Sequence, residues 1–386
     1  MIVGVIVGLV VLVLLVVVHE LGHALVAKRN GVVVEEFGIG FPPRAKKWKV
    51  EQSFLGKDVT FSINWLPLGG FVRLKGEYDA AEGRGMYGSA TFWVKTKILL
   101  AGVAMNWLTA AVLFSILAVV GLPKILPQQL QLPFDTSVYR SPVMVAKVEQ
   151  GSPAGSAGLK VHDQIVAIDG KRIMTSADLS AMTKSHAGRE ITVTYKRHGA
   201  AETSMRVQLR DSNRARSGGY LGVTSQQTEK LYSTWSAPIV GVAVTGQLSY
   251  ETVKGIGDVV GKSLSGLFGQ FFHSGEAKQA AQADLETVSK SVMGPIGILG
   301  VLFPSIVQSG IVQVLLLAAI ISLTLAVMNI LPIPGLDGGR WVTMAVFRLF
   351  RKKLTREREE SIQAIGMMVL LLLTILVTVS DIKKFF

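Results

Sequence analysis

The stretch MIVGVIVGLVVLVLLVVVHELGHALVA, residues 1–27, decides the fold because it sets polar residues inside a membrane-spanning length of aliphatic ones. About 20 apolar residues cross a bilayer core of about 30 Å. The stretch lacks a basic start and a small-residue cleavage site, so it is predicted to be an uncleaved span and not a signal peptide. Only His19, Glu20 and His23 interrupt it. An ionisable group within a membrane costs roughly 2.5–3.5 kcal/mol, so three polar residues in one turn indicate function.

These three residues form the motif HExxH, whose spacing suits a metal site. On a helix, residues i and i+4 face the same way about 6 Å apart along the axis, so His19 and His23 can hold one metal ion. Glu20 projects from nearly the same region and can accept a proton from an attacking water. The alternative is a polar contact between helices, which needs one polar residue and leaves two unexplained.

The composition is that of a membrane protein. Of 386 residues, 49% are hydrophobic and 17% are charged, whereas a soluble domain carries about 25% charge. These values exclude a disordered chain and argue against one large soluble enzyme. The chain has no cysteine, which excludes disulfides and thiol nucleophiles.

Three more spans are predicted at Ile98–Val120, Ile311–Leu331 and Gln363–Ser380. Cations concentrate in the loops after the first span and before the last, at Lys28, Arg29, Arg44, Lys46, Lys47, Lys49, Arg73, Lys75, Arg348, Arg351, Lys352, Lys353, Arg356 and Arg358. Because short basic loops stay in the cytoplasm, both loops are expected there, with the termini and the central segment outside. The net charge of +13 thus follows from topology, and no basic element interleaved with aromatic residues suggests nucleic acid.

The segment Pro238–Phe272 is long and fairly apolar but carries a stripe of charges at Glu251, Lys254, Asp258 and Lys262. This spacing is typical of an amphipathic helix, which either lies on the membrane or packs on the central domain.

The central segment alternates short β-rich runs with turns, and residues 151–173, GSPAGSAGLKVHDQIVAIDGKRI, resemble bacterial PDZ domains. The runs are Val143–Val148, Gln164–Ile168, Ile191–Tyr195 and Met205–Leu209. A PDZ domain binds an extended peptide as an added strand. The stretch Gly219–Val223 is either its carboxylate-binding loop or, as turn chemistry favours, an ordinary strand after the domain.

A catalytic zinc usually takes three protein ligands, and Asp337 is the candidate for the third. It lies in NILPIPGLDGG, residues 329–339, where two prolines break a helix and glycines allow close backbone approach. The expected topology also places Asp337 toward the same side of the membrane as the histidines. Asp337 lies eleven residues before Arg348, and His19 lies nine residues before Lys28. A crossing by Pro238–Phe272 would break this match.

Together, HExxH, one PDZ domain and the late LDGG motif resemble the site-2 protease family, most closely the bacterial regulator-of-sigma-E type. Two further stretches agree: Phe61–Leu74 resembles the family's membrane-reentrant β-hairpin, and Gly102–Asn106 resembles its G-x-x-x-N signature. The chain departs from its relatives in having one PDZ domain and not two. It also has Arg340 where many relatives have histidine.

This resemblance implies one Zn²⁺ per chain, with Glu20 as the general base. The implied zinc ligands are His19, His23 and Asp337, with Asn329 beside the bound peptide and Asn106 supporting the site. Lesser roles in substrate binding fall to Pro67, Gly69 and Gly70.

The expected fold class is an α-helical polytopic membrane protein, with about four spans and a membrane-associated β-hairpin, carrying an inserted α+β PDZ domain. The predicted parts are residues 1–121 with HExxH and the hairpin, an extracytoplasmic PDZ domain at 125–225, an amphipathic helical linker at 226–310, and 311–386 with LDGG. The expected function is intramembrane cleavage of single-pass membrane proteins, such as anti-sigma factors or remnant signal peptides, in a bacterial inner membrane. Lipid and a peptide on the PDZ domain are the other expected partners. A metal-ion transporter and a PDZ scaffold with a vestigial metal site are the alternatives.

Overall fold

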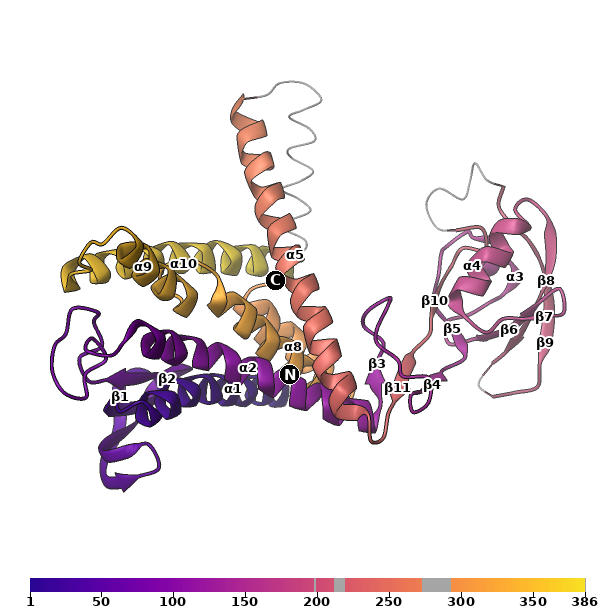
Figure 1. Ribbon diagram of the computed structural model, residues 1–386. Coiled ribbons are helices and arrows are strands. Elements are labelled where there is room, and N and C mark those ends of the chain that lie inside the picture. The colour runs from indigo at the N-terminus through magenta and orange to yellow at the C-terminus, as the bar shows by residue number, and fades with distance from the viewer. Residues whose placement is uncertain (198, 212–218, 273–292, 386) are drawn as a thin grey trace. The chain divides into compact units, whose positions relative to one another are not determined.

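The computed structural model describes residues 1–197, 199–211, 219–272 and 293–385. The chain divides into two compact units, Met1–Val120 with Trp235–Phe386, and Gly121–Thr234 (Figure 1). The first unit contains α1 (Ile2–Arg29), β1 (Val34–Ser53), β2 (Gly56–Leu74), α2 (Phe92–Val120), α5 (Ala237–Phe272), η2 (Gly297–Leu302), α7 (Phe303–Gln308), α8 (Ile311–Ile330), α9 (Asp337–Leu349) and α10 (Arg356–Phe385).

Among the described residues, four helices are long and apolar enough to cross a membrane, namely α1, α2, α8 and α10. They coincide with the four predicted spans, and the predicted fold class is confirmed. Helices α2 and α10 begin six to seven residues before the predicted spans, at Phe92 and Arg356. A helix of 29 or 30 residues is roughly 44 Å long, which exceeds the hydrocarbon core, so its polar first turns lie beyond the apolar segment.

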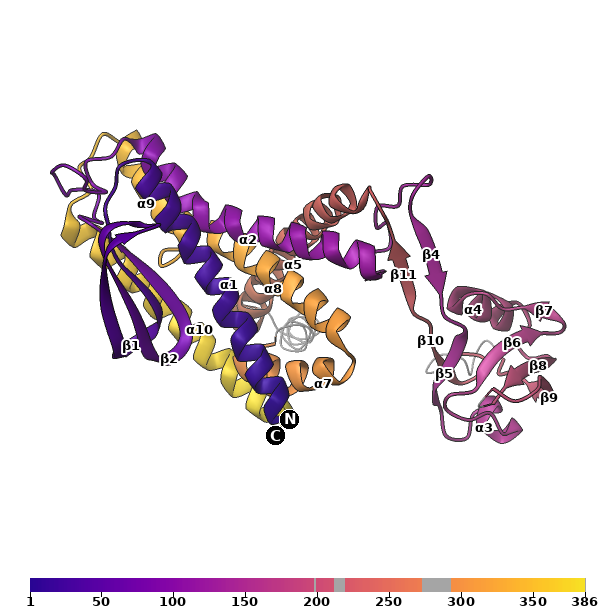
Figure 2. The ribbon, with the colours of Figure 1, turned by 90° about the horizontal axis from the view of Figure 1, so that it is seen from below.

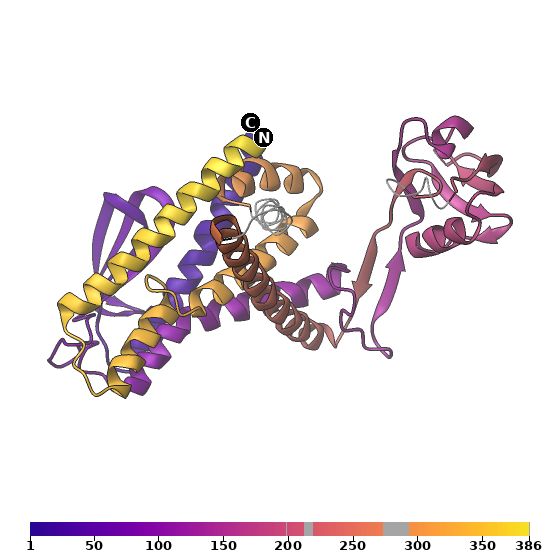
Figure 3. The ribbon, with the colours of Figure 1, turned by 90° about the horizontal axis from the view of Figure 1, so that it is seen from above.

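Helix α2 is central in the first unit and packs on α1, α5 and α8 (Figures 2 and 3). Small residues permit the approach. A Cβ added to Gly22 of α1 would lie 2.5 Å from the Ala101 carbonyl oxygen of α2. Lipid tails are as apolar as leucine, so close packing of this kind is the main force that associates helices in a membrane.

Helix α5 contains Pro238–Phe272, the segment that the sequence places either on the membrane or against the central domain. Its first half packs on α2 and α8. A Cβ on Gly241 would lie 2.1 Å from Ser115 Oγ, and Trp107 donates a 3.1 Å hydrogen bond to Ser249. The predicted stripe of four charges is exposed throughout. Residues 273–292 of the predicted linker lie outside the described residues.

Strands β1 and β2 form a long two-stranded ribbon that folds back on itself, and the stretch Phe61–Leu74 predicted to be a hairpin lies wholly within β2. Residues 36–39 of β1 face both residues 60–63 and residues 70–73 of β2. This doubling leaves residues 70–74 without a further strand on their other side among the described residues. That segment instead lies against α1, where Gly70 approaches Val16 and Glu20.

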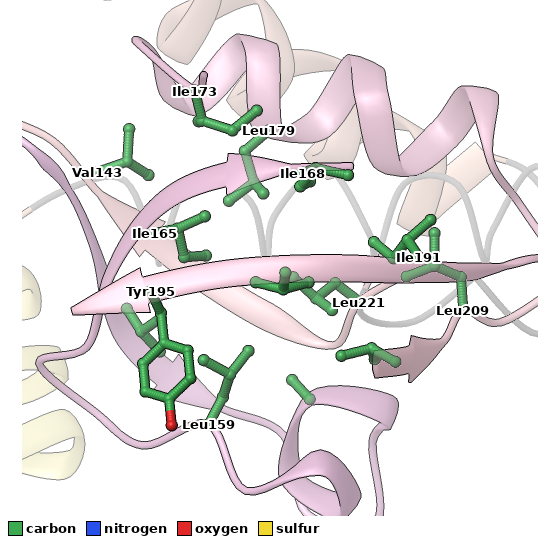
Figure 4. Packing of buried hydrophobic residues seen from close by; sticks show 14 residues of the cluster. Val143, Leu159, Ile165, Ile168, Ile173, Leu179, Ile191, Tyr195, Leu209 and Leu221 are labelled. Atoms are coloured by element: carbon green, nitrogen blue, oxygen red, sulfur yellow. The ribbon is translucent and has the colours of Figure 1, made fainter. Parts of the chain in front are cut away.

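The second unit has the predicted PDZ architecture, with a sheet in the order β10-β5-β6-β8-β9 and β7 paired to β6. Its elements are β3 (Leu122–Pro123), β4 (Ser137–Arg140), β5 (Val143–Val148), α3 (Pro153–Ala157), β6 (Gln164–Ile168), β7 (Lys171–Arg172), α4 (Ser176–Ser185), β8 (Glu190–Lys196), β9 (Thr203–Gln208), β10 (Val223–Gln226) and β11 (Glu229–Tyr232). Figure 4 shows its core, in which Ile165, Ile168 and Ile191 pack beneath α4. The sequence predicts β5 and β6 to the residue.

Two details of this unit correct the sequence analysis. The favoured interpretation of Gly219–Val223 as a strand after the domain is wrong. Residues 219–221 form a turn, Leu221 is buried in the core, and the chain then enters β10, which pairs with β5 in the same sheet. The helical linker predicted from residue 226 instead begins with strand β11, which pairs with β3 and β4. Both strands depend on partners some 80 to 100 residues away, so local pattern does not reveal them.

Candidate metal centre

Three side chains from two helices converge on one point in the first unit. Asp337 Oδ2 lies 3.1 Å from His19 Nε2 and 3.2 Å from His23 Nε2. The two Nε2 atoms are 3.2 Å apart. One ligand atom from each residue lies within 4.8 Å of the others, so the three predicted ligands can reach a single ion. Both histidines are buried, as the cost of polar groups within a membrane demands.

Each imidazole is oriented by a contact of its other ring nitrogen, Nδ1. His23 Nδ1 lies 2.7 Å from the Ile98 carbonyl oxygen of α2, to which it donates, so its Nε2 lone pair faces the cluster. Asn106, the predicted supporting residue, places its amide nitrogen 3.4 Å from His19 Nδ1. Its Oδ1 is buried and makes no hydrogen bond within the described parts of the chain. If the oxygen and nitrogen of the Asn106 amide exchange places, Oδ1 accepts a hydrogen bond from His19 Nδ1. His19 then has the same tautomer as His23, with the proton on Nδ1 and the Nε2 lone pair available to a metal.

Gly102 explains how α2 comes so close to the imidazoles. A Cβ at this position would lie 2.4 Å from His23 Nε2 and 2.6 Å from His19 Cε1. Residue 102 faces both rings because α1 and α2 cross here, as Gly22 against Ala101 also shows. Gly102 is the first residue of the G-x-x-x-N motif, whose spacing alone indicates no role for it.

Asp337 is placed by an irregular connection between α8 and α9. Helix α8 ends at Ile330, and Asp337 is the first residue of α9. The two glycines that follow allow the fold, because a Cβ on Gly338 would lie 2.1 Å from the Ile330 oxygen and one on Gly339 2.0 Å from the Ile333 oxygen. Gln363 of α10 accepts a 2.7 Å hydrogen bond from the Gly335 amide and so holds the connection from the other side.

A cavity of about 130 Å³ adjoins the cluster and contains the predicted base. Glu20, His23 and Asp337 line it together with Val72 and Leu74 of β2 and with Ile98, Leu99, Glu77, Tyr87 and Arg340. Space for water and a substrate carbonyl therefore exists beside Glu20. The Val72 backbone also donates a hydrogen bond to Glu20, so the edge of β2 that pairs with no described strand borders the base directly.

Arg340 forms the far wall of this cavity and belongs to an ionic network. Its Nε donates a 3.0 Å hydrogen bond to Glu359 of α10, and its Nη2 donates to the Glu77 carbonyl oxygen. The guanidinium also lies over Tyr87, 5.1 Å from the ring centroid. Burial raises the pKa of the Tyr87 phenol well above its usual range, so this hydroxyl stays protonated. From the sequence, Asp337, three residues before Arg340, was the acid that this cation was expected to affect, whereas the structure pairs it with Glu359.

The remaining predicted residues are more dispersed. Asn329 lies in the last turn of α8, half-buried. Pro67 is exposed in β2, and Gly69, at φ +110°, lies against Phe41. Gly70 approaches Glu20, since a Cβ there would be 3.6 Å from Glu20 Cγ. Gly70 therefore lies beside the predicted base.

Comparison with known proteins places the chain in a family. The model of peptidase family M50 matches residues 7–373. A Clostridium acetobutylicum protein with a provisional zinc metalloprotease name is 30% identical over 95% of this chain and 94% of its own. Regulator of sigma-W protease RasP of Bacillus subtilis is 24% identical over 95% of each chain. The PDZ domain of an SdrC-like protein of Listeria monocytogenes covers 25% of this chain and 93% of its own, at 24% identity and a TM-score of 0.19. The chain therefore belongs to peptidase family M50, the site-2 protease family of zinc metalloproteases, as its motifs predict.

Proposed function

We propose that this metalloprotease cleaves peptide bonds within the membrane-spanning segments of single-pass membrane proteins. The observation that carries the proposal is the convergence of His19, His23 and Asp337 beside Glu20, on a helix that is otherwise aliphatic for a full membrane span. A transporter needs ion ligands along a path but gives no reason for a carboxylate between two of them. A scaffold needs neither the ligands nor the base.

The residues present fit zinc. Two imidazole nitrogens and one carboxylate oxygen are the donors of a catalytic site that keeps one position open. Asp337 Oδ2 is buried without a hydrogen bond in the described structure although it lies near both imidazoles, which suits an oxygen that binds a cation. We assign one Zn²⁺ per chain to His19 Nε2, His23 Nε2 and Asp337 Oδ2. Bound there, zinc supplies a Lewis acid for the scissile carbonyl and lowers the pKa of water.

Glu20 carries the proton in this scheme. It faces the cavity beside two of the ligand residues, so its carboxylate can take a proton from the attacking water. It then gives that proton to the nitrogen of the departing amine, and the peptide bond breaks. Two other carboxylates line the cavity among the described residues. Asp337 is a proposed zinc ligand, and Glu77 lies beside Arg340, which donates to its backbone oxygen.

The edge of residues 70–74 that no strand of the described residues pairs with provides a place for the substrate. A helical segment hides its carbonyls in its own hydrogen bonds, so it must unwind before cleavage, and an opened strand can pair with an unpartnered strand edge. Gly70 and Val72 place this edge next to Glu20. Asn329, Pro67 and Gly69 are proposed to contact the substrate farther from the reacting bond, and Asn106 to support His19.

We place the protein in a bacterial cytoplasmic membrane, with the metal centre toward the cytoplasm and the PDZ domain outside. The basic loop that follows α1 and the one that precedes α10 support this orientation. In the PDZ domain, β10 is an edge strand that follows the 219–222 turn, so it can receive a peptide as an added strand. Anti-sigma factors are proposed substrates because one relative is named a regulator of sigma-W protease, and remnant signal peptides suit the same site.

The test is cleavage of a purified single-pass substrate by Glu20→Gln, with Glu51→Gln, an exposed glutamate of β1, as the matched control. The amide keeps the shape of the side chain but cannot act as a base, so Glu20→Gln should retain zinc and lose roughly 10²–10⁴-fold in rate. Asp337→Ala should lose both zinc and activity. Turnover by Glu20→Gln within about tenfold of wild type would remove Glu20 from the role of base.

A further inference from the structure

A second, larger cavity of about 720 Å³ lies in the first unit, away from the metal ligands. The loop between β2 and α2, the first turn of α2, the last turns of α9 and the start of α10 enclose it. Helices α2 and α9 lie side by side here (Figure 3). None of the three metal ligands lines it.

The rim of this cavity is strongly basic. Five cations from four segments line it, Lys95, Arg348, Lys352, Lys353 and Arg356, against two acids, Asp79 and Glu82. Lys95 pairs with Asp79, and Arg356 pairs with Glu360 at 2.8 Å. For Arg348, Lys352 and Lys353 the described structure gives no carboxylate within ion-pair distance. Three positive charges thus remain without acidic partners around one hollow.

The floor of the same cavity is apolar. Met344, Phe347 and Leu354 line it and pack together with Phe92 and Leu99. Large apolar side chains also project beside the rim: Trp93 is 71% exposed, Leu349 77% and Phe350 67%. Trp93 is in the first turn of the membrane-spanning helix α2, where tryptophan typically lies at the level of the lipid headgroups.

We propose that this cavity binds the headgroup of an anionic phospholipid, with the phosphate among Arg348, Lys352 and Lys353 and the glycerol end over the apolar floor. Basic residues at cytoplasmic helix ends are common for topological reasons alone. That explanation accounts for their number but not for the hollow with an apolar floor that Arg348, Lys352 and Lys353, at the end of α9 and in the loop after it, line together with α2 and α10. Free phosphate fits less well, because it would leave the apolar floor and the exposed Trp93, Leu349 and Phe350 without a partner. Basic pockets between membrane helices are the kind of site that anionic headgroups occupy.

The test is native mass spectrometry of the full chain in detergent, with phosphatidylglycerol or phosphatidylcholine added. The wild type should retain phosphatidylglycerol at least about tenfold more than phosphatidylcholine. The triple variant Arg348→Gln/Lys352→Gln/Lys353→Gln should lose roughly tenfold or more of that retention, given the contribution of each cation near anionic lipid. The control variant Lys46→Gln/Lys47→Gln/Lys57→Gln removes three exposed cations of the β-hairpin and should retain wild-type binding.

A second variant separates the cavity from the charge. Ala80 is exposed and lines the cavity, so Ala80→Trp should narrow it without changing charge and should also reduce phosphatidylglycerol retention. Equal retention by the two triple variants would overturn the proposal. Unchanged binding in Ala80→Trp would also overturn it, since the lipid would then lie on the general surface. Displacement of phosphatidylglycerol by millimolar inorganic phosphate would identify a free-anion site instead.

Discussion

Substituting Gly102 by alanine tests the metal centre without touching any ligand. The added Cβ would lie 2.4 Å from His23 Nε2, whereas ordinary contacts begin near 3.4 Å. Either ring or helix must therefore move by about 1 Å. His23 is also fixed by its hydrogen bond to the Ile98 carbonyl one turn earlier on α2, so a shift of α2 displaces the ring as well.

The expected effect follows from that displacement. Disturbing groups that orient a metal ligand lowers metal affinity about 10–100-fold. Misplacing a catalytic constellation by 1 Å costs about a hundredfold in rate. We therefore expect zinc affinity, measured by chelator competition, to fall at least tenfold. At saturating zinc, kcat/KM on a single-pass substrate should fall by about two orders of magnitude.

Gly246→Ala is the matched control, because a Cβ at this α5 position would meet no atom within 4 Å. Both variants replace a helical glycine by alanine and gain similar helix propensity, up to about 1 kcal/mol. A change in helix propensity therefore cannot explain a loss confined to Gly102→Ala. Zinc affinity and kcat/KM within twofold of wild type in Gly102→Ala would refute the close approach of α2 to both imidazoles.

Two further predictions concern the support of His19 and the topology. Asn106→Leu should lower zinc affinity about 10–100-fold, whereas Asn106→Asp, which can only accept, should keep most of it; the reverse order would show that Asn106 donates to His19. The chain has no cysteine, so Lys46→Cys and Lys171→Cys give single labelling sites. In intact cells a membrane-impermeant maleimide should label only residue 171, and labelling of residue 46 alone would invert the proposed orientation.

The sequence predicted the spans and the pairing of His19 with His23 because each leaves a local pattern. The convergence of Asp337 with them was predicted from the expected topology and the family resemblance. Spans are contiguous apolar runs, and the histidine pair follows helical periodicity. Asp337 is marked by the prolines and glycines that shape its connection. These features survive in a single sequence because they depend on residues close to one another in the chain.

The rest of the site depends on tertiary contacts that leave no local pattern. The partner of His23 Nδ1 is the backbone of Ile98, 75 residues away, and any residue type supplies a carbonyl. The partner of Arg340 is Glu359, which is buried near the start of a helix that is mostly exposed. Strand β10 was misassigned for the same reason, since its place in the PDZ sheet is set by β5.

At this centre, the close packing of the helices is what brings the metal ligands together. Gly22 and Gly102 let α1 and α2 approach, and Gly338 lets α9 fold back on the end of α8, so that ligands from two helices meet. The approach also buries Asp337 Oδ2 without a hydrogen bond in the described structure. An unsatisfied polar atom within a membrane costs several kcal/mol. A cation held by Asp337 and the two imidazoles removes that cost, so zinc binding should hold α9 against α1 as well as provide the chemistry.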